Sequence, residues 1–406
     1  MAFEKIPYKK PLVIGMGGGN DIVSATLVLS DLTNAGKKPD LAGICSPGAW
    51  HIYNEKEEKP VNIVTSQTKR HRPSKNPVEL SFLDIKLPEL LKEQNINSKV
   101  YNLSLRYGTS SLISGMQELI KERKYDGIIA VDVGGDILAR GAKDPTILSP
   151  LMDFTMMYVL SQIETPSTLV VFGLQTDGEL RPKGCEEILQ ELKSSKLLED
   201  TLTIKSSDKA VKTFEKIYRR IENIRHGHTA EMTFETLKAT EDIHAEYRRT
   251  IRILDRKWHQ KFPITLEAKY FGKAFVIDLK ALAKTRELAF PYKTPLELYI
   301  KTKKIVDTKT EMDMMYTWTN ETCLWLGLLC PQVQNSERKE ILKYGLDNLD
   351  VHADVALLWK KDNMDTDGMI KQSIDDFVLI GKSKERILQV NEEIRKILGE
   401  IENETR

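Results

Sequence analysis

Short apolar runs alternate with segments of helical spacing along the first 205 residues. The runs predicted to be strands are Pro11–Gly15, Leu41–Cys45, Val61–Thr65, Val100–Leu105, Gly127–Val133 and Ser167–Phe172. The segments predicted to be helices are Asn20–Ala35, Thr109–Arg123, Pro150–Ile163 and Gly184–Ser194. The apolar runs do not alternate with polar residues, which is typical of parallel strands covered by helices on both faces. The pattern therefore predicts a doubly wound, mainly parallel α/β domain, Rossmann-like in architecture, over residues 1–205.

The character of the chain changes at about Ser206. Ser207–Pro263 is highly charged and helical in pattern, Ala274–Leu279 predicts a further strand, and Lys384–Glu404 predicts an amphipathic helix. We expect a helix-rich α+β domain over residues 206–406. The last helix has a stripe of Ile387, Val390, Ile394, Ile397 and Ile401. Two heptads are marginal as a coiled coil, so this stripe favours packing on the protein's own body, with a homo-oligomer as the alternative.

Composition narrows the class of protein. The 406 residues contain 60 Lys and Arg against 59 Asp and Glu, which gives a formal net charge of +1. This charge lacks the positive excess that is typical of a dedicated nucleic-acid-binding protein. The longest apolar stretch, Cys323–Cys330, is far short of the roughly 18 residues of a membrane helix, and Met1–Lys5 begins no signal peptide. Four cysteines make neither a disulfide framework nor a CxxC metal site. We expect a cytoplasmic protein without membrane or nucleic-acid partners.

Three of the predicted strands run into loops that combine glycine with acidic residues. These loops are Gly15–Asp21 (GMGGGND), Asp132–Asp136 (DVGGD) and Gly173–Glu179 (GLQTDGE). Ligands of an open parallel sheet bind at the carboxyl ends of its strands, near a switch in strand order. If the three strands are neighbours, one crevice receives five carboxylates, those of Asp21, Asp132, Asp136, Asp177 and Glu179. Each loop taken alone is equally compatible with a helix cap or an ordinary turn.

Such a cluster of carboxylates must share protons or attract positive charge. Oxygen ligands without paired His or Cys suit Mg²⁺ or Mn²⁺, and a cationic substrate group would satisfy the same field. We expect a Mg²⁺- or Mn²⁺-dependent enzyme acting on a small polar, anionic metabolite, with hydrolase, transferase and isomerase chemistry all open. Asp132, Asp136 and Asp177 would hold the ion, and Asp21 or Glu179 would act as general acid or base.

The alternative is a protein that binds a nucleotide or NAD(P), with the first loop as a phosphate cradle. The backbone N–H groups available for a cofactor are those of Gly17, Gly18, Gly19, Asn20, Gly134 and Gly135. A P-loop needs Lys and then Ser or Thr after its last glycine, whereas Asn20 and Asp21 follow here. The GxGxxG pattern meets Asn20 at its third glycine, and Asp40 lies at the wrong end of the second strand to bind a ribose. These departures weaken the alternative without excluding it.

Three weaker motifs do not change the predicted site or function. His226, His228 and Glu231 have metal-like spacing, but two His at i and i+2 do not share a helix face, so a helix cap or loop competes with a ligand role. The basic run Lys69–Arg72 suits either an anionic substrate or an exposed loop. Asn363–Gly368 imitates the start of an EF-hand, but Ile374 stands where the twelfth-position Glu is needed, which excludes calcium there.

The glycine–carboxylate loops carry a family resemblance. The chain resembles an uncharacterised domain-of-unknown-function family of archaea and some bacteria, marked by GGGxD and DVGGD loops. The residues that carry this resemblance are Gly17–Val23, Asp132–Asp136, and Gly173 with Asp177–Glu179. The resemblance covers most of the first half and, more loosely, Arg225–Glu231. It implies that the three loops form one site, and it implies no activity. One departure is that Leu174 and Gln175 stand where a further glycine is expected.

Overall fold

The protein is described by a computed structural model. It describes residues 2–18, 21–45, 51–53, 59–65, 68–71, 86–140, 144, 151–175, 180, 182–222, 228–238, 268–286, 291, 318–319, 323–326, 355–359, 370–374, 377–381 and 383–404.

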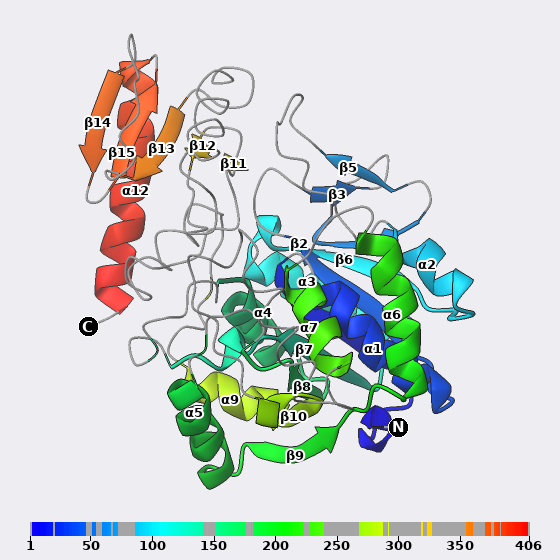
Figure 1. The fold of residues 1–406 in the computed structure, drawn as a ribbon. Coiled ribbons are helices and arrows are strands. Elements are labelled where there is room, and N and C mark those ends of the chain that lie inside the picture. The colour runs from blue at the N-terminus through cyan, green and yellow to red at the C-terminus, as the bar shows by residue number, and fades with distance from the viewer. Residues whose placement is uncertain are drawn as a thin grey trace.

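An eight-stranded sheet organises the larger part of these residues (Figure 1). Its strands are β1 (Pro11–Gly18), β2 (Asp40–Cys45), β4 (Val61–Val64), β6 (Val100–Ser104), β7 (Gly127–Val133), β8 (Ser167–Phe172), β9 (Leu198–Thr203) and β10 (Lys273–Asp278). They are arranged in the order β4-β6-β2-β1-β7-β8-β10-β9. The five strands from β6 to β8 are parallel, whereas β4 and β10 are antiparallel to their neighbours. The predicted doubly wound, mainly parallel sheet is confirmed.

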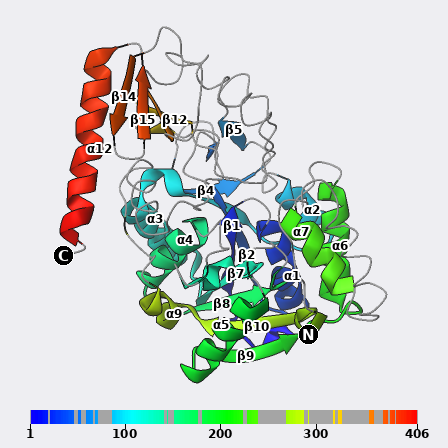
Figure 2. The ribbon, with the colours of Figure 1, turned by 60° about the vertical axis from the view of Figure 1, so that its left-hand side comes forward.

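Helices cover both faces of this sheet, and each face has its own apolar core (Figure 2). One face carries α1 (Asp21–Asn34), α2 (Leu87–Glu93), α6 (Lys209–Glu222) and α7 (His228–Lys238). The other face carries α3 (Thr109–Arg123), α4 (Leu151–Ser161), α5 (Pro182–Ser194) and α9 (Leu279–Thr285). Alternate residues of each strand enter opposite cores, as the period of a β-strand requires. Thus Ile14 and Met16 of β1 face α4, whereas Val13 faces α1.

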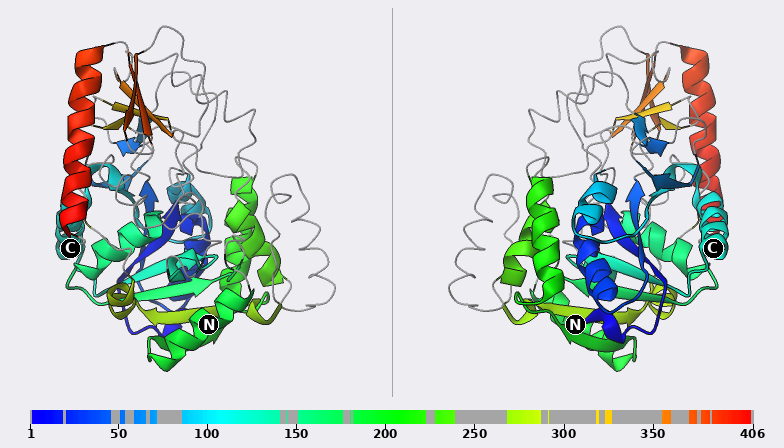
Figure 3. Two further views of the ribbon diagram at one scale, coloured as in Figure 1. Left: turned by 90° about the vertical axis from the view of Figure 1, so that its left-hand side faces the viewer. Right: turned by 90° about the vertical axis from the view of Figure 1, so that its right-hand side faces the viewer.

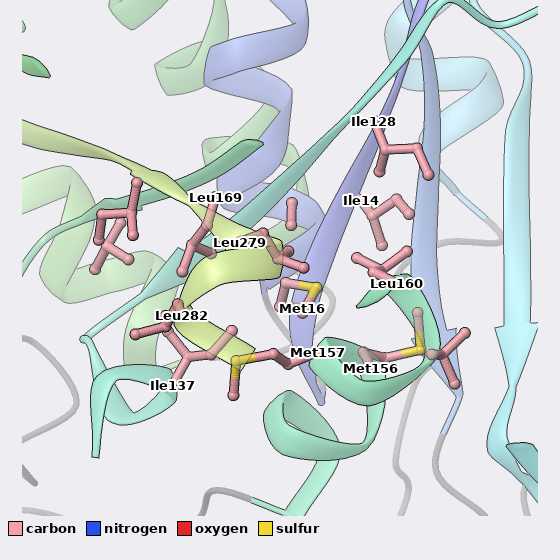
Figure 4. Close-up of a cluster of buried hydrophobic side chains, with 14 of the residues drawn as sticks. Ile14, Met16, Ile128, Ile137, Met156, Met157, Leu160, Leu169, Leu279 and Leu282 are labelled. Carbon is pink, nitrogen blue, oxygen red and sulfur yellow. The ribbon is translucent and has the colours of Figure 1, made fainter. Parts of the chain in front are cut away.

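The core on the α4 face is continuous from β1 to α9 (Figure 4). Figure 4 shows Met16, at the end of β1, beside Met157 of α4, and Leu282 of α9 beside Ile137. All four side chains are fully buried. Apolar packing therefore fixes α4 against β1, and α9 against α4, beside the edge at which ligands of such sheets bind.

The sheet continues past residue 206. Strand β10 pairs with both β8 and β9, and α6 and α7 pack on α1. Strand β10 ends one residue before the predicted end, because the side chain of Asp278 accepts a hydrogen bond from the Ala281 N–H and so starts α9. The first sheet thus draws on both halves of the predicted domain division.

A second sheet belongs to the C-terminal part of the chain. Its strands are β11 (Trp318–Thr319), β12 (Cys323–Leu326), β13 (Val355–Trp359), β14 (Ile370–Ile374) and β15 (Phe377–Gly381), antiparallel except for the β12–β13 pair. Helix α12 (Lys384–Glu404) runs along β13, β14 and β15 (Figure 3). Ile387, Val390 and Ile394 of its apolar stripe are buried. The prediction that this stripe packs on the protein's own body is confirmed for these residues.

The remaining described elements are short. They are the two-stranded ribbon of β3 (His51–Tyr53) and β5 (Lys69–His71), and the 3-10 turns η1 (Phe3–Lys5), η3 (Leu105–Tyr107), η4 (Asp136–Leu138) and η6 (Ala268–Tyr270). Among the described helices, none has the length and apolar character that a bilayer crossing requires.

Candidate metal centre

The three glycine–carboxylate loops follow three adjacent strands. β1 pairs with β7, and β7 pairs with β8. The chain leaves β1 through α1 towards β2 on one side, and leaves β7 through α4 towards β8 on the other. Strand order therefore reverses between β1 and β7, which is where open α/β sheets bind their ligands. The expected adjacency of these strands is confirmed.

Glycines allow α1 to begin directly against the end of β1. A Cβ on Gly15 would lie 2.3 Å from the backbone N of Ile22, closer than side chains approach. Asp21, the first residue of α1, turns back towards the strand, and its Oδ2 accepts a hydrogen bond from the Gly17 N–H at 2.9 Å. A Cβ on Gly17 would lie 2.6 Å from that same oxygen. The glycines thus hold the Asp21 carboxylate at the carboxyl end of β1.

Three buried carboxylates meet at this point. Asp132 of β7 lies between Val131 and Val133, which enter the α1 core, so its side chain points to the α4 face. Asp153 lies in the first turn of α4. One carboxylate oxygen from each of Asp21, Asp132 and Asp153 lies within 4.8 Å of the other two. Their exposed fractions are 5%, 0% and 2%.

Ionised together, the three carboxylates of this triad would repel one another strongly. Two unit charges at 4.8 Å interact by about 3.5 kcal/mol at an effective dielectric constant near 20. Three buried carboxylates at this spacing need a proton or a cation among them. Their donor set consists of oxygen alone, which suits Mg²⁺ or Mn²⁺. The residues present therefore fit a divalent metal ion.

The loops after β7 and β8 are joined to each other. Gly134 and Gly135 have φ angles of +114° and +102°, in the region that favours glycine. The Gly134 N–H donates a hydrogen bond to the Phe172 carbonyl, and the Gly134 carbonyl accepts one from the Gln175 N–H. Gln175 has φ of +74°, so it adopts the left-handed conformation for which a glycine was expected. Gly134 and Gly135 thus have a structural role in the turn.

The turn that follows the DVGGD loop is held from α9. In η4, Asp136 Oδ1 accepts the N–H of Ile137 at 3.1 Å. The Arg286 Nη2 donates to the Leu138 carbonyl at 3.2 Å, and its Nη1 donates to Glu191 Oε1 at 2.9 Å. The Arg286 side chain is only 3% exposed. A buried cation therefore fixes this turn beside the triad's strand.

The structure brings together Asp21 and Asp132 of the predicted residues and adds Asp153. Asp136 is buried but is not a member of the triad. Gly17 and Gly18 end β1. Gly19, Asn20, Asp177 and Glu179 lie outside the described residues. Asp153 was missed because the apolar residues around it predicted only a helix, although a carboxylate inside the run Leu151–Leu160 was a usable signal.

Asp40 lies at the opposite edge of the sheet, as the sequence indicated. It is the first residue of β2, and its Oδ2 accepts the hydroxyl of Tyr125 at 2.6 Å. Its Oδ1 accepts the Lys99 N–H at 2.7 Å. Burial, together with the hydrogen bond to Asp40, raises the pKa of Tyr125. Asp40 thus anchors the amino ends of the strands, far from the carboxyl end of β2 where a ribose-binding acid would lie.

Those residues of the weaker motifs that the structure describes are not members of the triad. His228 begins α7 and Glu231 is half-buried in its first turn, whereas His226 lies outside the described residues. Lys69–His71 form strand β5, and Arg72 is not described. The EF-hand-like segment 363–368 is not described either.

Comparison with known proteins identifies the family. A family model described as "Protein of unknown function (DUF1152)" matches residues 12–252, more than half of the chain. The chain belongs to this family. The DUF1152 match spans β1 to α7 and so includes all three triad residues, while β10 and α9 lie beyond it. Searches of curated proteins and of solved structures each found no match. The predicted membership of an uncharacterised domain family is confirmed, and the family carries no activity to transfer.

Proposed function

We propose that this protein is a Mg²⁺- or Mn²⁺-dependent enzyme acting on a small polar, anionic metabolite. The observation that carries the proposal is the triad of Asp21, Asp132 and Asp153, buried and within 4.8 Å at the switch point of the sheet. The three residues come from β7 and from the helices after β1 and β7, so the fold itself assembles the triad.

The triad residues would be the ligands of the ion. Bound there, the ion would polarise a substrate oxygen or lower the pKa of a bound water. Asp21 then serves as a ligand, held by the Gly17 N–H, in place of the general acid or base role expected from the sequence. Glu179, after β8, remains a candidate for proton transfer. Asp136, which the sequence predicted as a metal ligand, lies in the adjoining turn and becomes a second candidate for proton transfer.

The nucleotide alternative receives less support from the first loop. The Gly17 N–H, which a phosphate cradle would use, already donates to Asp21. A phosphate beside the Asp21 carboxylate would also be repelled unless a cation lay between them. We therefore place an anionic substrate group on the ion. The proposed location is the cytoplasm, and the near-neutral charge favours a small molecule over a nucleic acid.

A thermal-shift experiment separates the two functions. The metal-dependent function predicts stabilisation by Mn²⁺ alone, lost in Asp153→Asn. The nucleotide function predicts stabilisation by NAD(P) or ATP in EDTA, unaffected by that substitution. Hydrolysis, transfer and isomerisation of small anionic metabolites are then assayed with Mn²⁺ and with EDTA. No metal-dependent turnover in such a screen, together with no Mn²⁺ response, would refute the proposal.

A further inference from the structure

Gln175 combines three features that rarely occur together. It is fully buried, it has φ of +74°, and it lies in the loop directly after β8. A residue with a Cβ adopts this backbone conformation at an energetic cost that glycine does not have. Glycine would adopt it freely, so the chain keeps a glutamine side chain where the backbone favours glycine.

The backbone of Gln175 extends the pairing of β7 with β8. The strands pair as far as Val133 and Phe172. Beyond that pair, the Gly134 N–H donates to the Phe172 carbonyl at 3.2 Å, and the Gln175 N–H donates to the Gly134 carbonyl at 2.8 Å. Gly134 lies two residues after Asp132, so these bonds restrain the backbone that carries a triad carboxylate.

The side chain of Gln175 supplies what glycine could not. Its Nε2 donates to the Leu180 carbonyl at 3.3 Å. Leu180 also packs over Gly135, where a Cβ would lie 2.8 Å from its Cδ1 and 2.5 Å from Cδ1 of Leu174. Gln175 therefore ties Leu180 to the loop after β8 while Leu180 covers the loop after β7.

We propose that Gln175 is a positioning residue that locks the loops after β7 and β8 together and so sets the place of Asp132 in the metal centre. The proposal rests on the proposed function for its effect on metal affinity. The lock between the loops stands on the hydrogen bonds alone.

The test uses Gln175→Met in the full chain, because methionine keeps the volume and removes the donor. We expect Mn²⁺ affinity about tenfold weaker, the size of effect seen when a partner behind a metal ligand is lost. We also expect faster amide hydrogen exchange at residues 132–138, 173–175 and 180. Lys196→Met is the matched control, because Lys196 also has a positive φ, of +58°, but is exposed in the turn after α5.

Three outcomes decide the proposal. Weaker Mn²⁺ binding with faster exchange in both loops, and neither change in the Lys196 variant, supports it. A lower melting temperature with wild-type Mn²⁺ affinity overturns it, because the residue would then serve stability alone. If the wild-type protein binds no Mn²⁺, the proposed function fails, and exchange in Gln175→Met alone shows whether the lock exists.

Discussion

Replacing Asp132 by Asn tests whether the triad carries mutual repulsion. Asn keeps the shape of the side chain and removes one charge from the group. Each of the two remaining carboxylates has an oxygen within 4.8 Å, so each removed charge pair is worth about 3.5 kcal/mol when both partners are ionised. The stability gained by the variant cannot exceed about 4 kcal/mol, the cost of protonating an aspartate at neutral pH. The wild type can take up a proton at that cost and so relieve the repulsion. We therefore expect the variant to be more stable than the wild type by about 2–4 kcal/mol in EDTA, because the cost of protonation sets the upper limit.

The assay is thermal unfolding of both proteins, first in EDTA and then with Mn²⁺. In EDTA the Asp132→Asn variant should melt several degrees higher than the wild type. At a Mn²⁺ concentration of 100 times the dissociation constant, binding adds about 2.7 kcal/mol to the wild type and little to the variant. The difference between the two melting temperatures should therefore shrink or reverse.

A general packing defect cannot produce this pattern, because it would lower stability in both buffers. A variant that is less stable than the wild type in EDTA, and that Mn²⁺ stabilises as much as it does the wild type, would show that the triad neither carries mutual repulsion nor binds the ion. The stabilisation in EDTA should also diminish as the pH falls towards about 4, where the wild-type carboxylates take up protons at little cost.

Three further predictions concern the fold. Burial raises the pKa of Asp31, so its stabilising contribution is present at low pH and is lost as pH rises through the raised pKa. In urea unfolding, the Asp31→Asn variant should thus be more stable than the wild type at neutral pH. The difference in stability should disappear near pH 4, and a difference that stays constant across this pH range would contradict the expectation. Tyr125→Phe removes the hydroxyl that donates to Asp40 and should lower the free energy of unfolding by about 1–2 kcal/mol. It should leave Mn²⁺ affinity unchanged, because Tyr125 and Asp40 lie at the edge of the sheet opposite the triad. Gly15→Ala should lower the free energy of unfolding by about 3 kcal/mol or more, because the new Cβ would overlap the backbone of α1. Gly36→Ala is the control, since open space surrounds Gly36, and it should lower that free energy by about 1 kcal/mol. Equal losses in thermal unfolding would contradict the close contact at Gly15.

Strands and helices of the sheet could be predicted because local pattern determines them. Gly127–Val133, Ser167–Phe172 and Thr109–Arg123 have the predicted bounds, since continuous apolar runs and helical spacing are properties of the local sequence. Strand β10 could be predicted as a strand but not as the neighbour of β8. Its place depends on contacts between residues about 100 positions apart, which no local pattern encodes.

The site could be predicted in part for the same reason. Asp21 and Asp132 follow or end strands, so the rule for parallel sheets places them at one edge. Asp153 enters the site only because α4 packs over Met16 with that face inward, a consequence of tertiary packing. For Gln175 the sequence offered only an indirect signal, the glycine expected at Leu174 or Gln175, and the structure shows the left-handed backbone that a glycine would favour.

Anomalous diffraction from crystals grown with Mn²⁺ shows whether the three buried carboxylates bind a divalent ion. We expect one strong peak per chain, within coordination distance of carboxylate oxygens of Asp21, Asp132 and Asp153. The peak should be absent from crystals of Asp153→Asn. Wild-type crystals with no anomalous peak at these carboxylates, under Mn²⁺ concentrations that saturate ordinary protein sites, would contradict it.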